Sequence, residues 1–199
     1  MPTKHYFHLS EEKRRQISGA VVRDFQNNGY RDLKVSRIAE QIQLSRGSLY
    51  TYFRGKTDML QFAVVQIWRD FFEFNKKSLI GHSGDYWAML TDGLEYFLRH
   101  NGRMPMDLVM FSCSRNMAHE YVEWLFWHVD RRNMGFQTKD EFAALQDLCH
   151  TLVSLAVHEY QMGASDICKV RKDFALRLRH IKTGFLRTEE RAITGDSVE

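Results

Sequence analysis

Residues 38–53 read IAEQIQLSRGSLYTYF, a stretch with two short helical patterns separated by a turn. It completes a short helix that is expected at about residues 35–42, turns at residues 43–45, and starts a second short helix with Ser45 as its N-cap. Because a helix of two turns is unstable alone in water, two such helices joined by a three-residue turn indicate a helix-turn-helix. The apolar side chains expected between the helices are Ile38, Ala39, Ile42, Leu44 and Leu49.

The second short helix has the residue types that contact DNA. Arg46 is able to donate to O6 and N7 of a guanine in a major groove. Gly47 would cost about 1 kcal/mol inside a helix, but it lies in the first turn, where its missing side chain lets the backbone approach bases or phosphates. The hydroxyl and cationic side chains that suit phosphates are Ser48, Tyr50, Tyr52 and Lys56. The alternative is that these polar residues form an ordinary solvated helix face and contact no DNA.

Positive charge is concentrated in the same part of the chain. Residues 1–60 hold 11 Lys and Arg against 6 Asp and Glu, which gives a net charge of +5. The rest of the 199-residue chain holds 17 of the 28 basic and 19 of the 25 acidic residues, a net charge of −2. A basic N-terminal part followed by a nearly neutral remainder is typical of a protein that binds a polyanion with its N-terminal part.

Helical patterns continue through the whole chain, which has only two prolines. Ile17, Val21 and Phe25 recur every four residues in a helix expected from about Ser10 to a stop at Gly29. Further helices are expected at about residues 57–79, 85–101, 105–117, 119–134, 138–163 and 166–188. The predicted fold class is therefore all-α, with three short N-terminal helices followed by a body of longer helices.

Residues 37–60, RIAEQIQLSRGSLYTYFRGKTDML, resemble the DNA-binding signature of TetR-family repressors. The resemblance extends over about residues 12–64. It implies a helix-turn-helix DNA-binding domain at residues 1–56 and a ligand-binding and dimerisation domain at residues 57–199. It also implies a cytoplasmic homodimer that represses transcription from palindromic operators in double-stranded DNA and is released by a small apolar or aromatic effector.

Two departures from the family pattern affect the DNA-binding site. Gln43 stands where the turn normally has glycine, so either Gln43 adopts a left-handed conformation at a cost of about 1 kcal/mol or the turn differs. Lys34 stands where the first helix of the motif normally starts with Thr or Ser, whose hydroxyl caps the helix and contacts a phosphate. Here Ser36 is expected to supply the phosphate contact instead. The residues predicted at the DNA are Ser36, Arg37, Ser45, Arg46, Gly47, Ser48, Tyr50, Tyr52 and Lys56.

The last two long helices have broad apolar faces, and the resemblance implies that they pair with their copies in a dimer. Packing against the rest of the same chain is the alternative use of these faces, and both uses can coexist. The residues predicted at the dimer interface are Phe142, Leu145, Cys149, Leu152, Phe174, Leu178 and Ile181.

Residues 86–128 are rich in Trp, Phe and Met, most of which are expected in an ordinary core. The resemblance implies an effector pocket among them, because side chains of this kind suit a flat or flexible apolar molecule. The residues predicted to line the pocket are Trp68, Phe72, Trp87, Met110, Trp124 and His128. A partner protein bound by the helical body, in place of a small molecule, is the alternative.

Neither a metal nor another cofactor is expected. His119-Glu120 and His158-Glu159 match half of a zinc-binding HExxH motif, but each lacks the second histidine. Catalytic fingerprints such as GxSxG, a phosphate-binding loop or a dinucleotide motif are missing, so an enzyme is not expected. A catalytic helical protein would be indicated only by turnover without DNA affinity.

The expected location is the cytoplasm. The three cysteines lack CxxC spacing, which favours reduced thiols. No apolar run of 18 residues and no signal-peptide core occurs.

Overall fold

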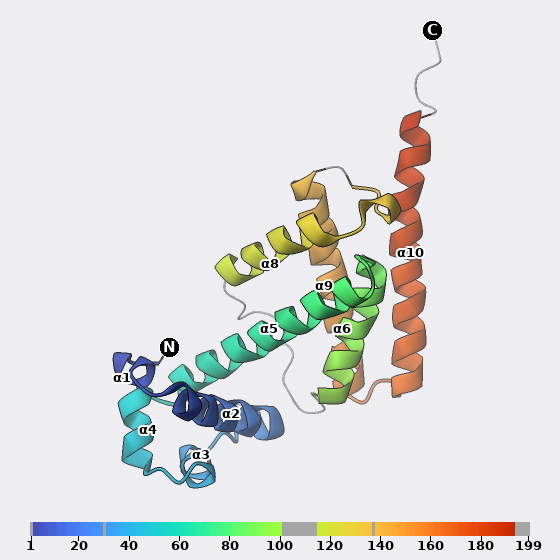
Figure 1. Ribbon diagram of the computed structural model, residues 1–199. Coiled ribbons are helices and arrows are strands. Elements are labelled where there is room, and N and C mark those ends of the chain that lie inside the picture. The colour runs from blue at the N-terminus through green and yellow to red at the C-terminus, as the bar shows by residue number, and fades with distance from the viewer. Residues whose placement is uncertain (1, 30, 101–114, 137, 194–199) are drawn as a thin grey trace. The chain divides into compact units, whose positions relative to one another are not determined.

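The computed structural model describes residues 2–29, 31–100, 115–136 and 138–193 (Figure 1). In those residues the regular structure is helical and contains no strand, which confirms the predicted all-α class. The helices are α1 (Lys4–Phe7), α2 (Glu11–Asn28), α3 (Val35–Gln41), α4 (Arg46–Tyr52), α5 (Lys56–Gly81), α6 (Tyr86–His100), α8 (Arg115–His128), the 3-10 turn η1 (Arg131–Asn133), α9 (Lys139–Gln161) and α10 (Ile167–Ile193).

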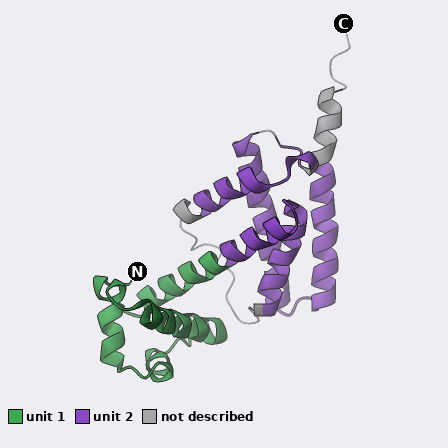
Figure 2. Cartoon of the chain, in the orientation of Figure 1, with its two compact units in different colours: residues 1–70, 101–114 green, residues 71–100, 115–199 purple. Residues whose placement is uncertain are grey.

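The described residues fall into two compact units, shown in Figure 2. Residues 1–70 belong to the first unit, and residues 71–100 and 115–199 belong to the second. Helix α5 contributes to both, since the division falls after Asp70. The functional boundary between residues 56 and 57 stays a prediction.

Helix α2 begins and ends as its sequence predicts. The Ser10 hydroxyl caps the helix by accepting from the Lys13 N–H at 3.3 Å. The expected stripe is fully buried, and its members are Ile17, Ala20, Val21 and Phe25. The helix ends at Gly29, whose φ of 68° is a conformation that side-chain-bearing residues rarely adopt.

Helix α1 was not predicted, because four residues cannot form a stable helix without tertiary contacts. Its buried Tyr6 supplies those contacts. The Tyr6 ring lies 5.8 Å from Phe53 and 5.3 Å from Phe62, centroid to centroid. Aromatic rings tilted in this way pack favourably in a core.

The core of the second unit lies between α6, α9 and α10, with α8 packed on α9. Helix α9 starts with a capping box in which the Thr138 hydroxyl accepts from the Glu141 N–H and the Glu141 carboxylate accepts from the Thr138 N–H. Buried Phe142 and Phe174 come from α9 and α10 and fill the space that these packed helices enclose.

The helix predicted at residues 119–134 ends earlier than expected, at His128. The Asp130 N–H donates to the Gly84 carbonyl at 2.9 Å, and the Asp130 side chain caps η1, so the chain leaves the helical path there. Gly84 allows this approach, since its φ is +89° and an added Cβ would lie 2.8 Å from the Asp130 nitrogen. The helix predicted at residues 105–117 lies mostly outside the described residues.

Candidate DNA-binding site

The two short helices form a capped helix-turn-helix. The Ser45 hydroxyl accepts from the Ser48 N–H at 3.0 Å and starts α4, as predicted. Gln43 has a φ of 52°, so the left-handed alternative for the turn is confirmed. The Leu44 N–H closes the turn by donating to the Ala39 carbonyl at 2.9 Å.

Helix α4 buries one side and leaves the other open. Leu49 is fully buried and fixes the inner side of the helix. The outer side presents Arg46, Gly47, Tyr50 and Thr51, all exposed, while Ser48 and Tyr52 are half-buried. The face available to DNA therefore combines one guanidinium, one bare stretch of backbone and two hydroxyls.

The packing of this chain does not require glycine at position 47. A Cβ added to Gly47 would meet only the Ser45 hydroxyl oxygen, at 3.7 Å, which is an ordinary contact. Gly47 is helical and shows no positive φ. Any requirement for a bare backbone at this position must come from a surface outside the chain.

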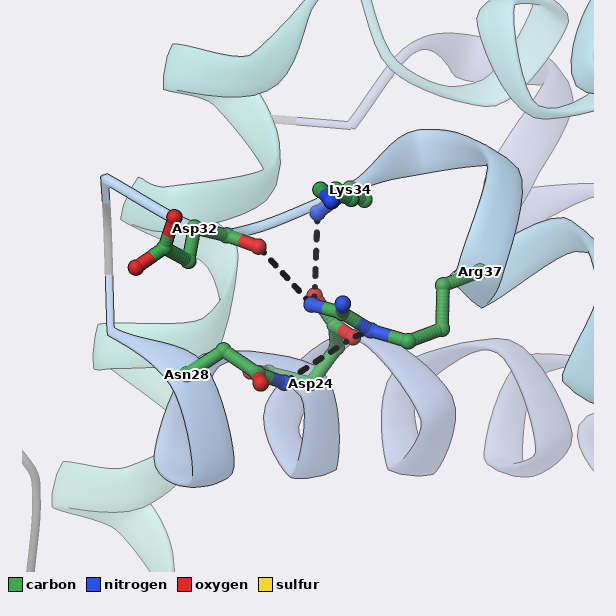
Figure 3. A network of polar contacts seen from close by, with 5 residues as sticks. All are labelled: Asp24, Asn28, Asp32, Lys34 and Arg37. Atoms are coloured by element: carbon green, nitrogen blue, oxygen red, sulfur yellow. Dashed lines mark hydrogen bonds and ion pairs between the residues drawn. The ribbon is translucent and has the colours of Figure 1, made fainter.

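A buried carboxylate holds the start of α3 (Figure 3). Asp24 on α2 is 1% exposed, and its Oδ2 accepts from the Lys34 N–H at 3.1 Å. Lys34 is the N-cap of α3 and makes no side-chain cap bond of its own, so the carboxylate of Asp24 ties down the place where the sequence lacks a capping hydroxyl. Asn28 donates to the Asp24 backbone carbonyl at 3.0 Å.

Arg37 completes this network from α3. Its Nε and Nη2 donate to the two carboxylate oxygens of Asp24, and Nη2 also donates to the Asp32 carbonyl at 2.8 Å. The hydrogen bonds to Asp24 raise the pKa of Arg37 above its ordinary value, so the guanidinium stays charged. The structure thus places Arg37, a predicted DNA contact, in a bidentate ion pair that joins α3 to α2.

The other two predicted phosphate contacts lie at helix starts. Ser36 is exposed in the first turn of α3, and Lys56 is the first residue of α5. The Lys56 ammonium donates to the Arg31 carbonyl at 2.8 Å. Backbone N–H groups at helix starts favour anions, so a phosphate contact at both residues stays a prediction that agrees with their positions.

The N-terminal segment holds the far end of α4, and no sequence motif marks this contact. The Thr3 N–H donates to the Tyr52 carbonyl at 2.8 Å, and the Thr3 hydroxyl donates to the Thr51 carbonyl at 2.7 Å. These carbonyls belong to the last turn of α4 and have no partner within a helix. Thr3 therefore acts as a C-terminal cap supplied from a distance.

The residues predicted to line an effector pocket are distributed over both units. Trp68 is buried in the first unit, and Phe72 and Trp87 are buried in the second. Trp124 stacks on the exposed ring of His128 at 3.9 Å. Met110 lies outside the described residues.

The residues predicted at the dimer interface pack into the chain's own core, apart from Ile181, which is half-buried. The buried ones are Phe142, Leu145, Cys149, Leu152, Phe174 and Leu178. These six therefore pack within the same chain, which is one of the two expected uses of the faces. Their role in a dimer stays a prediction. The sequence reasoning did not single out the exposed leucines on the same helices.

Two further features are missing from the part of the chain that the structure describes. No three side chains from His, Cys, Asp and Glu lie together there in a way that could hold a metal. Within the same residues, no helix combines the length and apolarity needed to cross a membrane.

The geometry defines a class: an all-α DNA-binding protein that uses a helix-turn-helix. The family model for bacterial regulatory proteins of the tetR family matches residues 20–62, which contain α3, the turn and α4. Residues 20–62 therefore carry the DNA-binding domain of the TetR family, whose members are transcriptional regulators that bind DNA and are not enzymes.

Solved structures share the fold at low sequence identity. A TetR variant from Acinetobacter baumannii in complex with minocycline is 16% identical, with a TM-score of 0.61, over 90% of this chain and 98% of that one. A transcriptional regulator from Streptomyces coelicolor is 18% identical, with a TM-score of 0.54, over 84% and 97%. The fatty acid degradation regulator FadR from Bacillus halodurans is 14% identical, with a TM-score of 0.50, over 89% and 96%. No curated protein matches the chain in sequence.

Proposed function

We propose that this regulator is a cytoplasmic homodimer that represses transcription from a palindromic operator and is released by a small apolar or aromatic molecule. The observation that carries the DNA-binding part is the outer side of α4. An exposed Arg46 stands beside Gly47, and nothing in the chain's own packing explains that glycine. A helix that enters a major groove supplies the missing reason, because its first turn approaches the base edges most closely.

The proposed dimer surface is the outer side of α9, opposite the buried residues. Leu148, Leu155 and Met162 are spaced by seven residues, which places them on one side of the helix, and all three are exposed. Leu176 on α10 is also exposed. A second copy would cover a continuous apolar stripe of this kind and would place two α4 helices on one face of DNA.

A matched pair of substitutions tests the dimer. Leu155→Glu changes an exposed residue and should give a folded monomer that has lost operator binding. Leu152→Glu, one turn away and buried, should unfold the chain because it buries an unpaired carboxylate. Light scattering gives the mass and circular dichroism the helix content. A folded dimer carrying Leu155→Glu would exclude this surface.

The operator itself can be found without knowing the regulated genes. Rounds of selection from random double-stranded DNA should recover a palindrome whose half-sites lie about one helical turn apart or slightly more. Recovery of a single, unpaired half-site would contradict a dimeric repressor. Apolar aromatic compounds that raise the melting temperature should weaken binding to that palindrome by a linked amount.

A partner protein bound in place of a small molecule is the second candidate, and Trp127 favours it. Its ring, near the end of α8, is 62% exposed, and Arg131 and Lys139 lie over it at 5.5 and 5.2 Å. Exposed aromatic residues beside cations are common in protein interfaces. If stabilising compounds left operator binding unchanged while Trp127→Ala altered regulation in cells, this candidate would replace the effector.

A further inference from the structure

One buried amide of the second unit lacks a partner. Asn75 on α5 is 4% exposed, and its Nδ2 donates to the Tyr121 hydroxyl at 2.8 Å. Its Oδ1 has no hydrogen-bond partner. Turning the amide over would let Oδ1 accept from Tyr121, but Nδ2 would then be unpaired instead. A buried polar group without a partner costs about 1–3 kcal/mol, so its presence calls for an explanation.

The Tyr121 hydroxyl is nearly as poorly paired. Tyr121 is buried on α8, and the acceptor of its proton is the Met89 sulfur at 4.0 Å, a weak thioether acceptor. Burial raises the pKa of Tyr121 well above its ordinary value, so the hydroxyl keeps its proton. Together, the two side chains offer a strong acceptor without a partner, the Asn75 Oδ1, and a strong donor that the chain pairs only weakly, the Tyr121 hydroxyl.

The Tyr121 ring also stacks on a second aromatic side chain. It lies on Phe72 with centroids 4.1 Å apart and an angle of 8° between the planes. Several aromatic pairs of this unit are tilted instead, such as Phe71 with Phe97 at 42° and Tyr86 with Phe142 at 66°. The ring of a flat ligand can stack on an aromatic face in the same parallel way.

The described surroundings favour a neutral ligand over a charged one. Among the described residues of the second unit, the buried polar side chains are Asn75 and Gln146, and neither is charged. Gln146 is already occupied, since its Oε1 accepts from the Tyr86 hydroxyl at 2.6 Å. Lys76, next to Asn75 on α5, pairs with Glu73 at 2.9 Å. A charged molecule beside Asn75 would therefore be desolvated without a counter-charge.

We propose that Asn75 and Tyr121 are the polar anchors of the effector site, and that the effector is a neutral, flat ring compound with an adjacent hydrogen-bond donor and acceptor. This deepens the proposed function and rests on its assumption that a small molecule acts on the chain. The ring opens the Phe72–Tyr121 stack and lies between the two faces, while its donor and acceptor pair with Asn75 and Tyr121. Sites that depart from ordinary pairing rules are typically functional, and here an unpaired amide oxygen lies beside a hydroxyl that has only a weak acceptor.

The test uses four bicyclic probes of similar shape on the full chain. 2-Quinolone has an adjacent N–H and C=O, quinoline has an acceptor only, naphthalene has neither, and 2-naphthoate is an anion. 2-Quinolone should bind the wild type about tenfold more tightly than naphthalene, the factor expected for one net hydrogen bond, and 2-naphthoate should bind most weakly. Melting temperatures and calorimetric titration give the order. Equal binding of 2-quinolone and naphthalene, or no response to 2-quinolone at its solubility limit, would overturn the proposal.

A matched pair of variants separates recognition from structure. Asn75→Leu with Tyr121→Phe removes the unpaired groups with little change of shape, so the ligand-free protein should melt at the same or a higher temperature. It should also lose the preference for 2-quinolone over naphthalene. The control Gln146→Leu removes a buried amide that does have a partner, so it should lower the melting temperature and keep the preference. A large loss of stability in the double variant would show that the pair is structural and would overturn the proposal.

Operator binding distinguishes failure of this site from failure of the proposed function. If 2-quinolone binds through Asn75 and Tyr121 without weakening operator binding, the site stands and release by an effector is wrong. If another compound releases the operator equally from the wild type and from the double variant, effector release stands and this site is wrong.

Discussion

The two units of this regulator treat their buried polar side chains in opposite ways. In the first unit, Asp24 is almost inaccessible and both of its carboxylate oxygens are paired, with Arg37 and with the Lys34 N–H. In the second unit, Asn75 is almost as buried, yet one of its polar atoms has no partner. A fully paired network holds one geometry, and a helix-turn-helix that contacts base edges needs a fixed geometry. An unpaired polar atom such as the Asn75 Oδ1 is still able to accept a hydrogen bond from a ligand.

The largest loss of stability is expected from a substitution that breaks the paired network of the first unit. Asp24→Ala leaves the Lys34 N–H and Arg37 without their buried acceptor and should lower the free energy of unfolding by about 3 kcal/mol. Urea denaturation measures this loss. The matched control is Glu11→Ala, which breaks the ion pair of Glu11 with Arg15, both of whose side chains are about three-quarters exposed. Since pairs at the surface contribute little, similar losses from the two variants would contradict the assigned role of Asp24.

A smaller loss of stability is expected at the C-terminal end of α4, where Thr3 caps the helix. Thr3→Val removes the hydroxyl that caps the Thr51 carbonyl and keeps the shape of the side chain. We expect a loss of about 0.5–1 kcal/mol in stability, together with faster hydrogen exchange in the last turn of α4 and weaker operator binding. Thr3→Ser retains the hydroxyl and should behave as the wild type. If the serine variant lost as much as the valine variant, the hydroxyl would not be the group that matters.

The smallest expected effect on the fold concerns Gly47. Gly47→Ala should leave stability unchanged or raise it by up to about 0.5 kcal/mol, because alanine favours helices and the added Cβ meets no close neighbour. Operator binding should nevertheless weaken, since the methyl group would separate the backbone from DNA. Thermal melting and operator titration of the same sample measure the two effects. A variant that is stabilised and binds the operator fully would show that DNA does not approach this position.

The helix-turn-helix could be predicted because its signals are local. The Ser45 cap, the Gly29 stop and the apolar spacing of α2 each act within a few residues, and the structure contains all three. Helix α1 could not be predicted, since Thr3 finds its partner 48 residues away. Asp24 left a signal that could have been used: an acidic residue beside Val21 and Phe25, on the buried side of its helix, needs a partner.

The candidate sites of the second unit were less accessible to sequence reasoning. The spacing of apolar residues located the buried faces of α9 and α10, but spacing does not tell whether a face meets its own chain or a second copy. Leu152 is buried and Leu155 is exposed, although both are leucines on one helix. The unpaired state of Asn75 depends on Tyr121, which lies 46 residues away, and no motif marks it.

A comparison of the wild type with two substitutions tests whether α4 reads bases in an operator. The binding preference of the wild type, Arg46→Ala and Lys56→Ala is determined on one pool of randomised operators at several salt concentrations. Arg46→Ala should relax the preference at one symmetric pair of positions, at a cost of about 1–3 kcal/mol per half-site. Lys56→Ala should weaken all sequences alike and reduce the salt dependence by about one unit per half-site. If Arg46→Ala instead weakened every sequence equally, α4 would not be the element that reads the operator.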